Sequence, residues 1–124
     1  MSKRITPLLL AAVGVLVARV ALADDTSAGE AVFKHSCAIC HATEAGRNKV
    51  GPSLFGVVGR KSGSVEGFNY SPAMKSANVT WAPDTLDKYL ADPKAFIPGD
   101  RMAFPGLKKE DERKAVIAYL ASLK

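Results

Sequence analysis

Two cysteines separated by two residues are followed directly by a histidine, in the run Cys37-Ala-Ile-Cys40-His41. This is the attachment pattern of haem c. Each thiol can add across one vinyl group of a haem to form a thioether, and the two intervening residues space the sulfurs to match those vinyls. The imidazole of His41 then lies under the iron and can ligate it. Because the motif occurs once, it predicts one covalently attached haem c per chain.

Three other uses of the two cysteines are less consistent with the sequence. A disulfide across so short a loop would be strained. A thioredoxin-like redox pair would need a βαβ context, and no strand pattern surrounds Cys37 and Cys40. A zinc site needs about four ligands, yet the chain has only one further histidine, His35.

The ligand on the other side of the iron decides between two classes of haem protein. An open position would allow oxygen, nitric oxide or peroxide to bind, as in a haem enzyme or gas-binding protein. A filled position favours electron transfer. His35 lies two residues before Cys37 and is poorly placed to reach the opposite face of the haem, so we expect it at the surface.

Met74 and Met102 remain as candidates for that ligand. Met102 lies in residues 97–106, a segment with two prolines and two glycines that predicts an irregular loop able to present a functional side chain. Met74 follows Ser71, a suitable N-cap, and Pro72, a suitable first helical residue. We therefore predict that Met102 ligates the iron and that Met74 packs in the core.

Residues 1–23 have the composition of a secretory signal peptide. A positive start and an apolar run over residues 5–18 lead to Ala21-Leu-Ala23, a small-residue cleavage site. A membrane span usually needs about 20 apolar residues, and Arg19 interrupts the run. We expect cleavage after Ala23, export to the periplasm and a mature domain over residues 24–124, with an uncleaved anchor as the alternative.

The charge of the chain gives no sign of nucleic-acid binding. The formal net charge of +5 includes three basic residues of the predicted leader, which leaves 14 basic and 12 acidic residues in the mature part. No basic stripe with interleaved aromatic residues is present. A domain of about 100 residues buries a modest core, so a covalent cofactor would supply much of the missing interior.

Three stretches show the apolar periodicity of amphipathic helices, at residues 26–40, 83–92 and 109–123. The run Ser27-Ala-Gly-Glu30 fits a capping box at the start of the first, and Pro93 ends the second. No stretch indicates a strand, so the sequence predicts an all-α domain.

Together these features resemble the class I c-type cytochromes, and in particular the small soluble carriers of alphaproteobacteria, which also resemble mitochondrial cytochrome c. The likeness covers essentially all of residues 24–124. It implies a cytochrome c fold of three main helices, short helices and loops around the haem, with Gly29, Phe33 and Tyr119 where the first and last helices cross. The motifs that carry it are Gly29 and Phe33, the run from Cys37 to His41, Gly51-Pro-Ser-Leu-Phe-Gly-Val-Val-Gly-Arg60, Tyr70, Trp81, Tyr89-Leu-Ala-Asp-Pro93 and Ile97-Pro-Gly-Asp-Arg-Met102.

The resemblance also implies partners for both predicted iron ligands. The Pro52 carbonyl would accept a hydrogen bond from the second ring nitrogen of His41, which fixes the ring and strengthens the ligand. Tyr89 would approach the sulfur of Met102 and help to set the reduction potential. Such a site implies a single-haem electron carrier between respiratory or photosynthetic partners, not an enzyme.

The same resemblance places Arg60, Tyr70 and Trp81 around a buried haem propionate, whose charge needs such partners. The alternative for Arg60 is a solvated surface residue. The alternative for the aromatic residues is simple core packing, which applies to Trp81, Tyr89 and Phe104. Two residues depart from the mitochondrial pattern: Asp100 replaces a threonine near the propionates, and Met74 replaces an asparagine. An acid beside propionates would be repulsive unless it is exposed or protonated.

Basic residues are expected to ring the haem edge where the thioethers approach the surface. They would steer transient docking to acidic patches on membrane or periplasmic redox proteins. Ordinary solvated side chains are the alternative. We further expect a monomer with no stable membrane insertion after cleavage; the rim residues are Lys49, Lys94, Arg101, Lys108 and Lys109.

Overall fold

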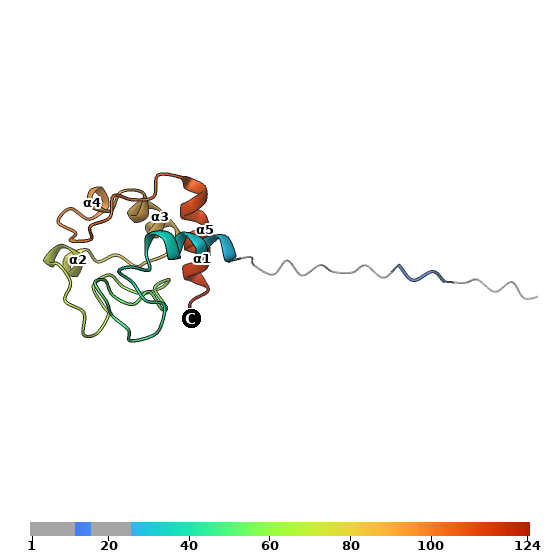
Figure 1. The fold of residues 1–124 in the computed structure, drawn as a ribbon, viewed down its shortest axis with the longest axis horizontal. Helices are drawn as coiled ribbons and strands as arrows, with labels where there is room; N and C mark the ends of the chain where they lie inside the picture. The colour runs from blue at the N-terminus through green and yellow to red at the C-terminus, as the bar shows by residue number, and fades with distance from the viewer. Residues whose placement is uncertain (1–11, 16–25) are drawn as a thin grey trace, which may run out of the picture.

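The structure is a computed structural model that describes residues 12–15 and 26–124. The predicted signal peptide lies almost entirely outside the described residues. In the described part, helices joined by long loops form one rounded domain (Figure 1). The helices are α1 (Ser27–Ser36), α2 (Pro72–Ser76), α3 (Pro83–Ala91), α4 (Pro93–Phe96) and α5 (Glu110–Ala121).

The predicted all-α class is confirmed. Apart from helices, the described residues contain one isolated β-bridge, between Lys61 and Thr80. The expected helices at 83–92 and 109–123 agree with α3 and α5 to within two residues at each end. The apolar periodicity therefore located two of the helices that contribute buried residues to the core.

The first helix is shorter than predicted. It ends at Ser36 and does not continue to Cys40. The backbone N–H groups of Cys37 and Ala38 both donate to the carbonyl of Phe33, at 2.8 and 2.9 Å. This shared acceptor turns the chain out of the helix, so the attachment motif lies in a turn that follows α1.

The two predicted helix starts have different outcomes. The capping box with Ser27 as N-cap is wrong, because Ser27 is the first helical residue and the N-cap is Thr26, which makes no side-chain cap hydrogen bond. At α2, the Ser71 side chain does accept the N–H of Met74, at 3.1 Å. The predicted core position of Met74 is confirmed, since only 9% of it is exposed.

Helices α1 and α5 cross at a glycine. A Cβ on Gly29 would lie 2.6 Å from the Cβ of Tyr119 and would collide with the backbone of Ala115. The rings of Phe33 and Tyr119 pack beside this contact with centroids 5.6 Å apart. The structure thus agrees with the crossing that the resemblance implied. The crossing brings the first and the last helix of the domain together (Figure 1).

Helix α3 packs on α5 through the core and through one ion pair. Nε of Arg113 lies 2.8 Å from Oδ1 of Asp87, and Nη1 of Arg113 donates to the carbonyl of Leu107. The arginine side chain is 13% exposed, so this pair is better shielded from water than the surface pairs on α1 and α5. The core beneath consists of Phe33, Val57, Tyr70, Met74, Trp81, Leu86, Tyr89, Ile97, Leu107, Val116, Ile117 and Leu120.

The length and composition of the helices decide whether any of them could cross a membrane. The longest helix, α5, has 12 residues, three of them acidic in its first turn. Within residues 12–15 and 26–124, no helix has both the length and the apolar character needed to cross a bilayer.

Candidate haem-binding site

The two cysteines lie one turn apart, directly after α1. Both thiols are free and half-buried. The N–H groups of Cys40 and His41 donate to the carbonyl of Cys37, at 3.1 and 3.0 Å, and this turn brings both cysteines and the histidine into one short segment. Ile39, between the cysteines, is 85% exposed, so the turn lies at the surface of the domain.

The electrostatics of the cysteines suit a thioether better than a thiolate site. Burial raises the pKa of Cys37 to about 11, with the neighbouring Cys40 acting in the same direction. Reactive redox pairs and zinc sites instead lower a cysteine pKa. In the described part of the chain, no cluster of three or more histidine, cysteine or carboxylate side chains is available to hold a metal ion.

The His41 ring is held in one orientation by its second nitrogen. Nδ1 lies 2.7 Å from the Pro52 carbonyl oxygen, so a neutral ring donates there and leaves Nε2 as an acceptor. Burial lowers the pKa of His41, the hydrogen bond to Pro52 opposes that shift, and the charges of Arg60 and Lys49 lower the pKa further. The imidazole is therefore kept neutral, which is the form that binds a metal.

Gly51 packs against the face of the same ring. A Cβ on this residue would lie 2.7 Å from Nδ1 of His41 and closer still to Cε1. Its N–H donates to the carbonyl of Cys40 at 2.8 Å, and its carbonyl accepts from the N–H of Lys49 at 2.9 Å. Gly51 thus lets the loop close over the imidazole, and the donor set of two thiols and one oriented imidazole fits a c-type haem.

Met102 lies on an ordered loop between α4 and α5. The loop turns at Gly99, whose φ is +92°, and the Asp100 N–H donates to the carbonyl of Ile97 at 3.0 Å. The N–H of Phe104 donates to the Met102 carbonyl at 2.9 Å. The Met102 side chain is half-buried and packs against the core, which is consistent with the predicted irregular loop.

Tyr89 joins this loop to α3. The tyrosine is buried, and its ring packs on Trp81 with centroids 4.9 Å apart. Its hydroxyl oxygen is 4.0 Å from the sulfur of Met102 and 2.6 Å from Oδ2 of Asp100. Burial raises the pKa of Tyr89, and the hydrogen bond and charge of Asp100 raise it further, so the hydroxyl keeps its proton at neutral pH.

Asp100 is the residue whose surroundings the sequence did not reveal. Only 8% of it is exposed, so exposure to water does not relieve the repulsion expected beside propionates. Both carboxylate oxygens accept hydrogen bonds, Oδ2 from Tyr89 and Oδ1 from the N–H of Met102 at 3.2 Å. The second of these is a local Asx-type contact that the sequence could have suggested, whereas the first depends on how α3 packs.

The three residues assigned to a propionate have different surroundings. Arg60 is half-buried, and Nη1 donates to the carbonyls of Ser53 and Phe55 at 2.8 and 3.3 Å, so it is not a fully solvated side chain. Tyr70 is buried, and its hydroxyl accepts the N–H of Val65 at 3.0 Å. Trp81 is 6% exposed. Their contact with a propionate stays a prediction.

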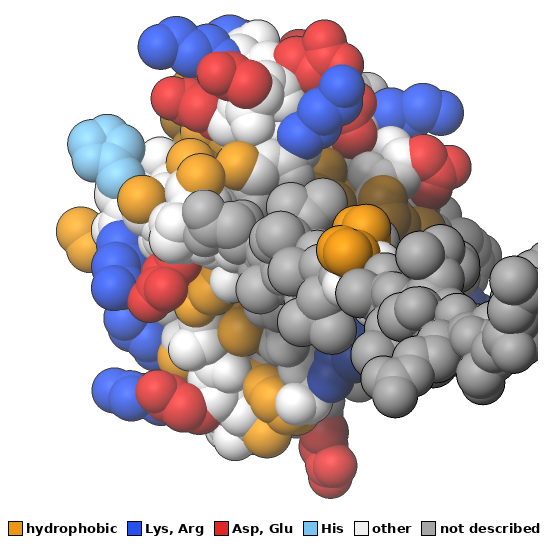
Figure 2. Space-filling model, turned by 90° about the vertical axis from the view of Figure 1, so that its right-hand side faces the viewer, with side chains coloured by type: hydrophobic (Ala, Val, Ile, Leu, Met, Phe, Trp, Pro, Cys, Tyr) orange, Lys and Arg blue, Asp and Glu red, His pale blue; other side chains and the backbone are white. Residues whose placement is uncertain are grey.

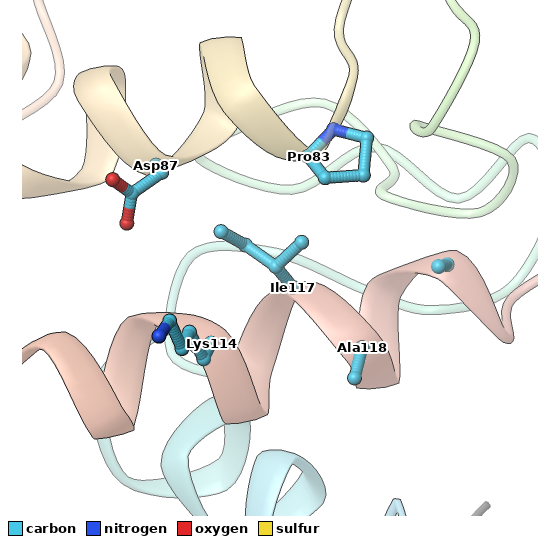
Figure 3. A pocket seen from close by; sticks show the side chains of 6 residues that line it. Pro83, Asp87, Lys114, Ile117 and Ala118 are labelled. Atoms are coloured by element: carbon cyan, nitrogen blue, oxygen red, sulfur yellow. The ribbon is translucent and has the colours of Figure 1, made fainter.

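A shallow apolar hollow lies away from these residues, between α3 and α5. Figure 3 shows the side chain of Ile117 on α5 pointing toward α3, where it faces Pro83 and Asp87. None of the residues predicted to bind haem lines this hollow; its lining consists of Pro83, Asp87, Lys114, Ile117, Ala118 and Ala121.

The five predicted rim cations are all exposed. Three of them also donate to backbone carbonyls: Lys49 to Ala38, Lys94 to Asp100 and Lys108 to Ala91, at 2.6, 3.1 and 2.9 Å. At the α1 and α5 end of the domain, acidic and basic side chains lie next to each other (Figure 2). The surface ion pairs on these two helices include Lys34–Glu30 and Lys114–Glu110.

The family of the chain follows from comparison with known proteins. A family model described as Cytochrome c matches residues 26–124, and the chain therefore belongs to the cytochrome c family. Members of this family bind haem c through two cysteines, here Cys37 and Cys40, and they carry electrons.

Individual relatives come from bacteria, fungi and plants. The chain is 56% identical over 88 residues to cytochrome c2 iso-2 of Magnetospirillum molischianum, covering 71% of this chain and 91% of the relative. It is 52% identical over 97 residues to cytochrome c of Gibberella zeae, covering 77% and 92%. It is 48% identical over 105 residues to cytochrome c of Arabidopsis thaliana, covering 84% and 94%. The predicted family, fold, cofactor and electron-carrier function are confirmed.

Proposed function

We propose that His41 and Met102 would both hold the iron of the haem, and that this cytochrome acts as a carrier without catalytic activity. Bound haem supplies a reversible one-electron change between ferric and ferrous iron. Thioether ligation favours the ferrous state relative to two histidines. A filled sixth position leaves no site for oxygen or peroxide, so the haem-enzyme alternative is not favoured.

The position of Met102 carries this proposal. The methionine lies on a loop that is fixed at the backbone by Asp100 and Phe104, and its sulfur lies near the buried Tyr89. On the other side, the hydrogen bond to Pro52 leaves Nε2 of His41 available for the iron. Because both side chains are held by ordered neighbours, little reorganisation would accompany electron transfer.

Pro52, Arg60, Tyr70, Trp81 and Tyr89 support the two ligands and a propionate in this proposal. Arg60 uses only Nη1 in the hydrogen bonds of the described structure, which leaves other guanidinium donors for a carboxylate. The burial of Tyr70 and Trp81 suits a shielded propionate, whose charge would otherwise be costly to bury.

We further propose that the domain is exported as a periplasmic monomer and docks transiently with membrane or periplasmic redox proteins. The leader composition of residues 1–23 supports export and cleavage. The exposed Ile39 between the cysteines and the cations at Lys49, Lys94, Arg101, Lys108 and Lys109 support docking at the thioether edge.

The ferric absorption spectrum tests the sixth ligand directly. A methionine–ferric haem bond gives a weak band at the red end of the spectrum. We expect this band in the wild-type protein and its loss in Met102→Ala. Met74→Leu is the matched control, because Met74 is buried in the core and a similar volume is retained; this variant should keep the band. A wild-type protein without the band, or Met102→Ala with it, would exclude the assignment.

A further inference from the structure

Asp100 places a carboxylate beside the predicted methionine ligand, inside the domain. Its exposed fraction is 8%, and Oδ2 lies 2.6 Å from the Tyr89 hydroxyl. Within the described residues, no lysine or arginine lies at ion-pair distance from this carboxylate; Lys94 reaches only the Asp100 backbone carbonyl, at 3.1 Å. A buried carboxylate without an ion-pair partner depends on its hydrogen-bond donors.

Two acceptors compete for one proton at Tyr89. The hydroxyl has a single hydrogen to donate. The carboxylate oxygen of Asp100 is 2.6 Å away, which is the short distance of a charge-assisted hydrogen bond, whereas the sulfur of Met102 is 4.0 Å away. A thioether sulfur is also a weak acceptor. The proton therefore points to Asp100.

We propose that Asp100 is a positioning residue that diverts the Tyr89 hydroxyl from the Met102 sulfur and thereby lowers the reduction potential of the haem. This inference rests on the proposed ligation by Met102. A sulfur that receives no hydrogen bond is a better electron donor to ferric iron. The negative charge of the carboxylate favours the ferric state as well, so both effects act in the same direction.

Asp100 also has a purely structural role, which the test must separate. Oδ1 accepts the N–H of Met102 at 3.2 Å and so shapes the loop. Asp100→Asn keeps an oxygen for this contact. Its amide nitrogen then faces Tyr89 and donates to the hydroxyl oxygen, which frees the hydroxyl proton for the sulfur. The substitution thus retains the contact that shapes the loop and changes the hydrogen bond between Tyr89 and residue 100.

A double-mutant cycle on the haem-loaded protein tests the inference. The reduction potential is measured for the wild type, Asp100→Asn, Tyr89→Phe and the double variant. We expect Asp100→Asn to shift the ferrous-to-ferric ratio several-fold toward ferrous at fixed ambient potential. Tyr89→Phe should lower the potential clearly when it is added to Asp100→Asn, and much less when it is added to the wild type.

Several results would overturn it. Equal shifts from Tyr89→Phe in both backgrounds would mean that the hydroxyl acts on the sulfur regardless of Asp100. An unchanged potential in Asp100→Asn would exclude the charge effect. Asp84→Asn, which removes the same charge from an exposed position on α3, is the control and should shift the potential little.

The red-end absorption band separates failure of this inference from failure of the ligand assignment. A wild type without the band rejects Met102 as ligand. A wild type with the band and additive potential shifts rejects the role of Asp100 alone. If Asp100→Asn does not load haem, Asp100→Ala removes the same charge and leaves the Met102 sulfur as the acceptor near the hydroxyl. Because it also removes the acceptor of the Met102 N–H, its potential is compared only where the red-end band is present. An unshifted potential in Asp100→Ala would then reject the inference.

Discussion

The histidine side and the methionine side of the site are built in different ways. On the histidine side, Cys37, Cys40 and His41 are consecutive parts of one turn, and Pro52 and Gly51 close on the imidazole from the next loop. The position of His41 is therefore fixed by its neighbours in the sequence and by close packing against its ring. A Cβ added at Gly51 would overlap with the ring atoms of His41.

The methionine side depends on segments that are distant in the sequence. Met102 is held by Asp100 on its own loop, Asp100 in turn accepts a hydrogen bond from Tyr89 on α3, and the loop turns at Gly99. The hydrogen bonds of this loop can break one at a time, and the left-handed turn at Gly99 can unfold separately from them. We therefore expect the two sides to differ in local stability, with the methionine side opening first.

The largest effect is expected on the histidine side. His41→Ala removes the imidazole that Pro52 orients. Substitutions of residues that only support a metal ligand already cost about 10–100-fold in metal affinity, so we expect little or no correctly ligated holo-protein. Holo-protein yield and the ferric spectrum measure this. His35→Ala, outside the attachment motif, should resemble the wild type; equal losses in both variants would contradict the assignment.

The next effect concerns the glycine beneath the imidazole. Gly51→Ala places a Cβ 2.7 Å from Nδ1 of His41, and overpacking of this kind should destabilise the protein by about 3 kcal/mol. Denaturant unfolding measures the loss. Gly46→Ala is the control, because Gly46 has φ +74° but open space around it, and should cost about 1 kcal/mol. Equal costs would mean that the close approach to His41 is unimportant.

A smaller effect is expected from the glycine of the methionine loop. Gly99→Ala meets a φ of +92° and a contact of 3.1 Å to the Ala73 Cβ, which should cost about 1–2 kcal/mol. The damage should be local: the red-end band should disappear at a lower denaturant concentration, while the helical circular dichroism changes less. Simultaneous loss of both signals, in the wild type and in the variant, would argue that the two sides open together.

The smallest effect concerns docking. Arg101→Glu reverses an exposed charge beside Met102, and we expect electron transfer to an acidic partner to slow several-fold at low salt and to recover toward the wild-type rate at high salt. Stopped-flow kinetics over a salt series measure this. Lys124→Glu, at the exposed C-terminus, is the control. Rates of the wild type that do not depend on salt would contradict steering.

More of the histidine side than of the methionine side could be predicted from the sequence, for a physical reason. The attachment motif is contiguous in the sequence. The prolines and glycines around Met102 predicted a loop because these residues determine the backbone conformation locally. The hydrogen bond from Tyr89 to Asp100 depends on the packing of α3 against that loop, which no local pattern encodes.

The error at the end of α1 has a similar origin. The turn after Ser36 still makes helix-like backbone contacts, for example from the N–H of His41 to the carbonyl of Cys37, so the apolar periodicity continues beyond the helix. The wrong capping box at Ser27 shows that a short motif does not fix a helix start to one residue.

The crossing of α1 and α5 at Gly29 also determines where the domain is joined to anything that precedes it. The start of α1 lies at one end of the domain, and α2 and α4 lie at the other (Figure 1). A leader that remained attached would therefore tether the domain from the end opposite α2 and α4. The tether would leave the surface around those two helices uncovered in the anchored form, as in the cleaved form.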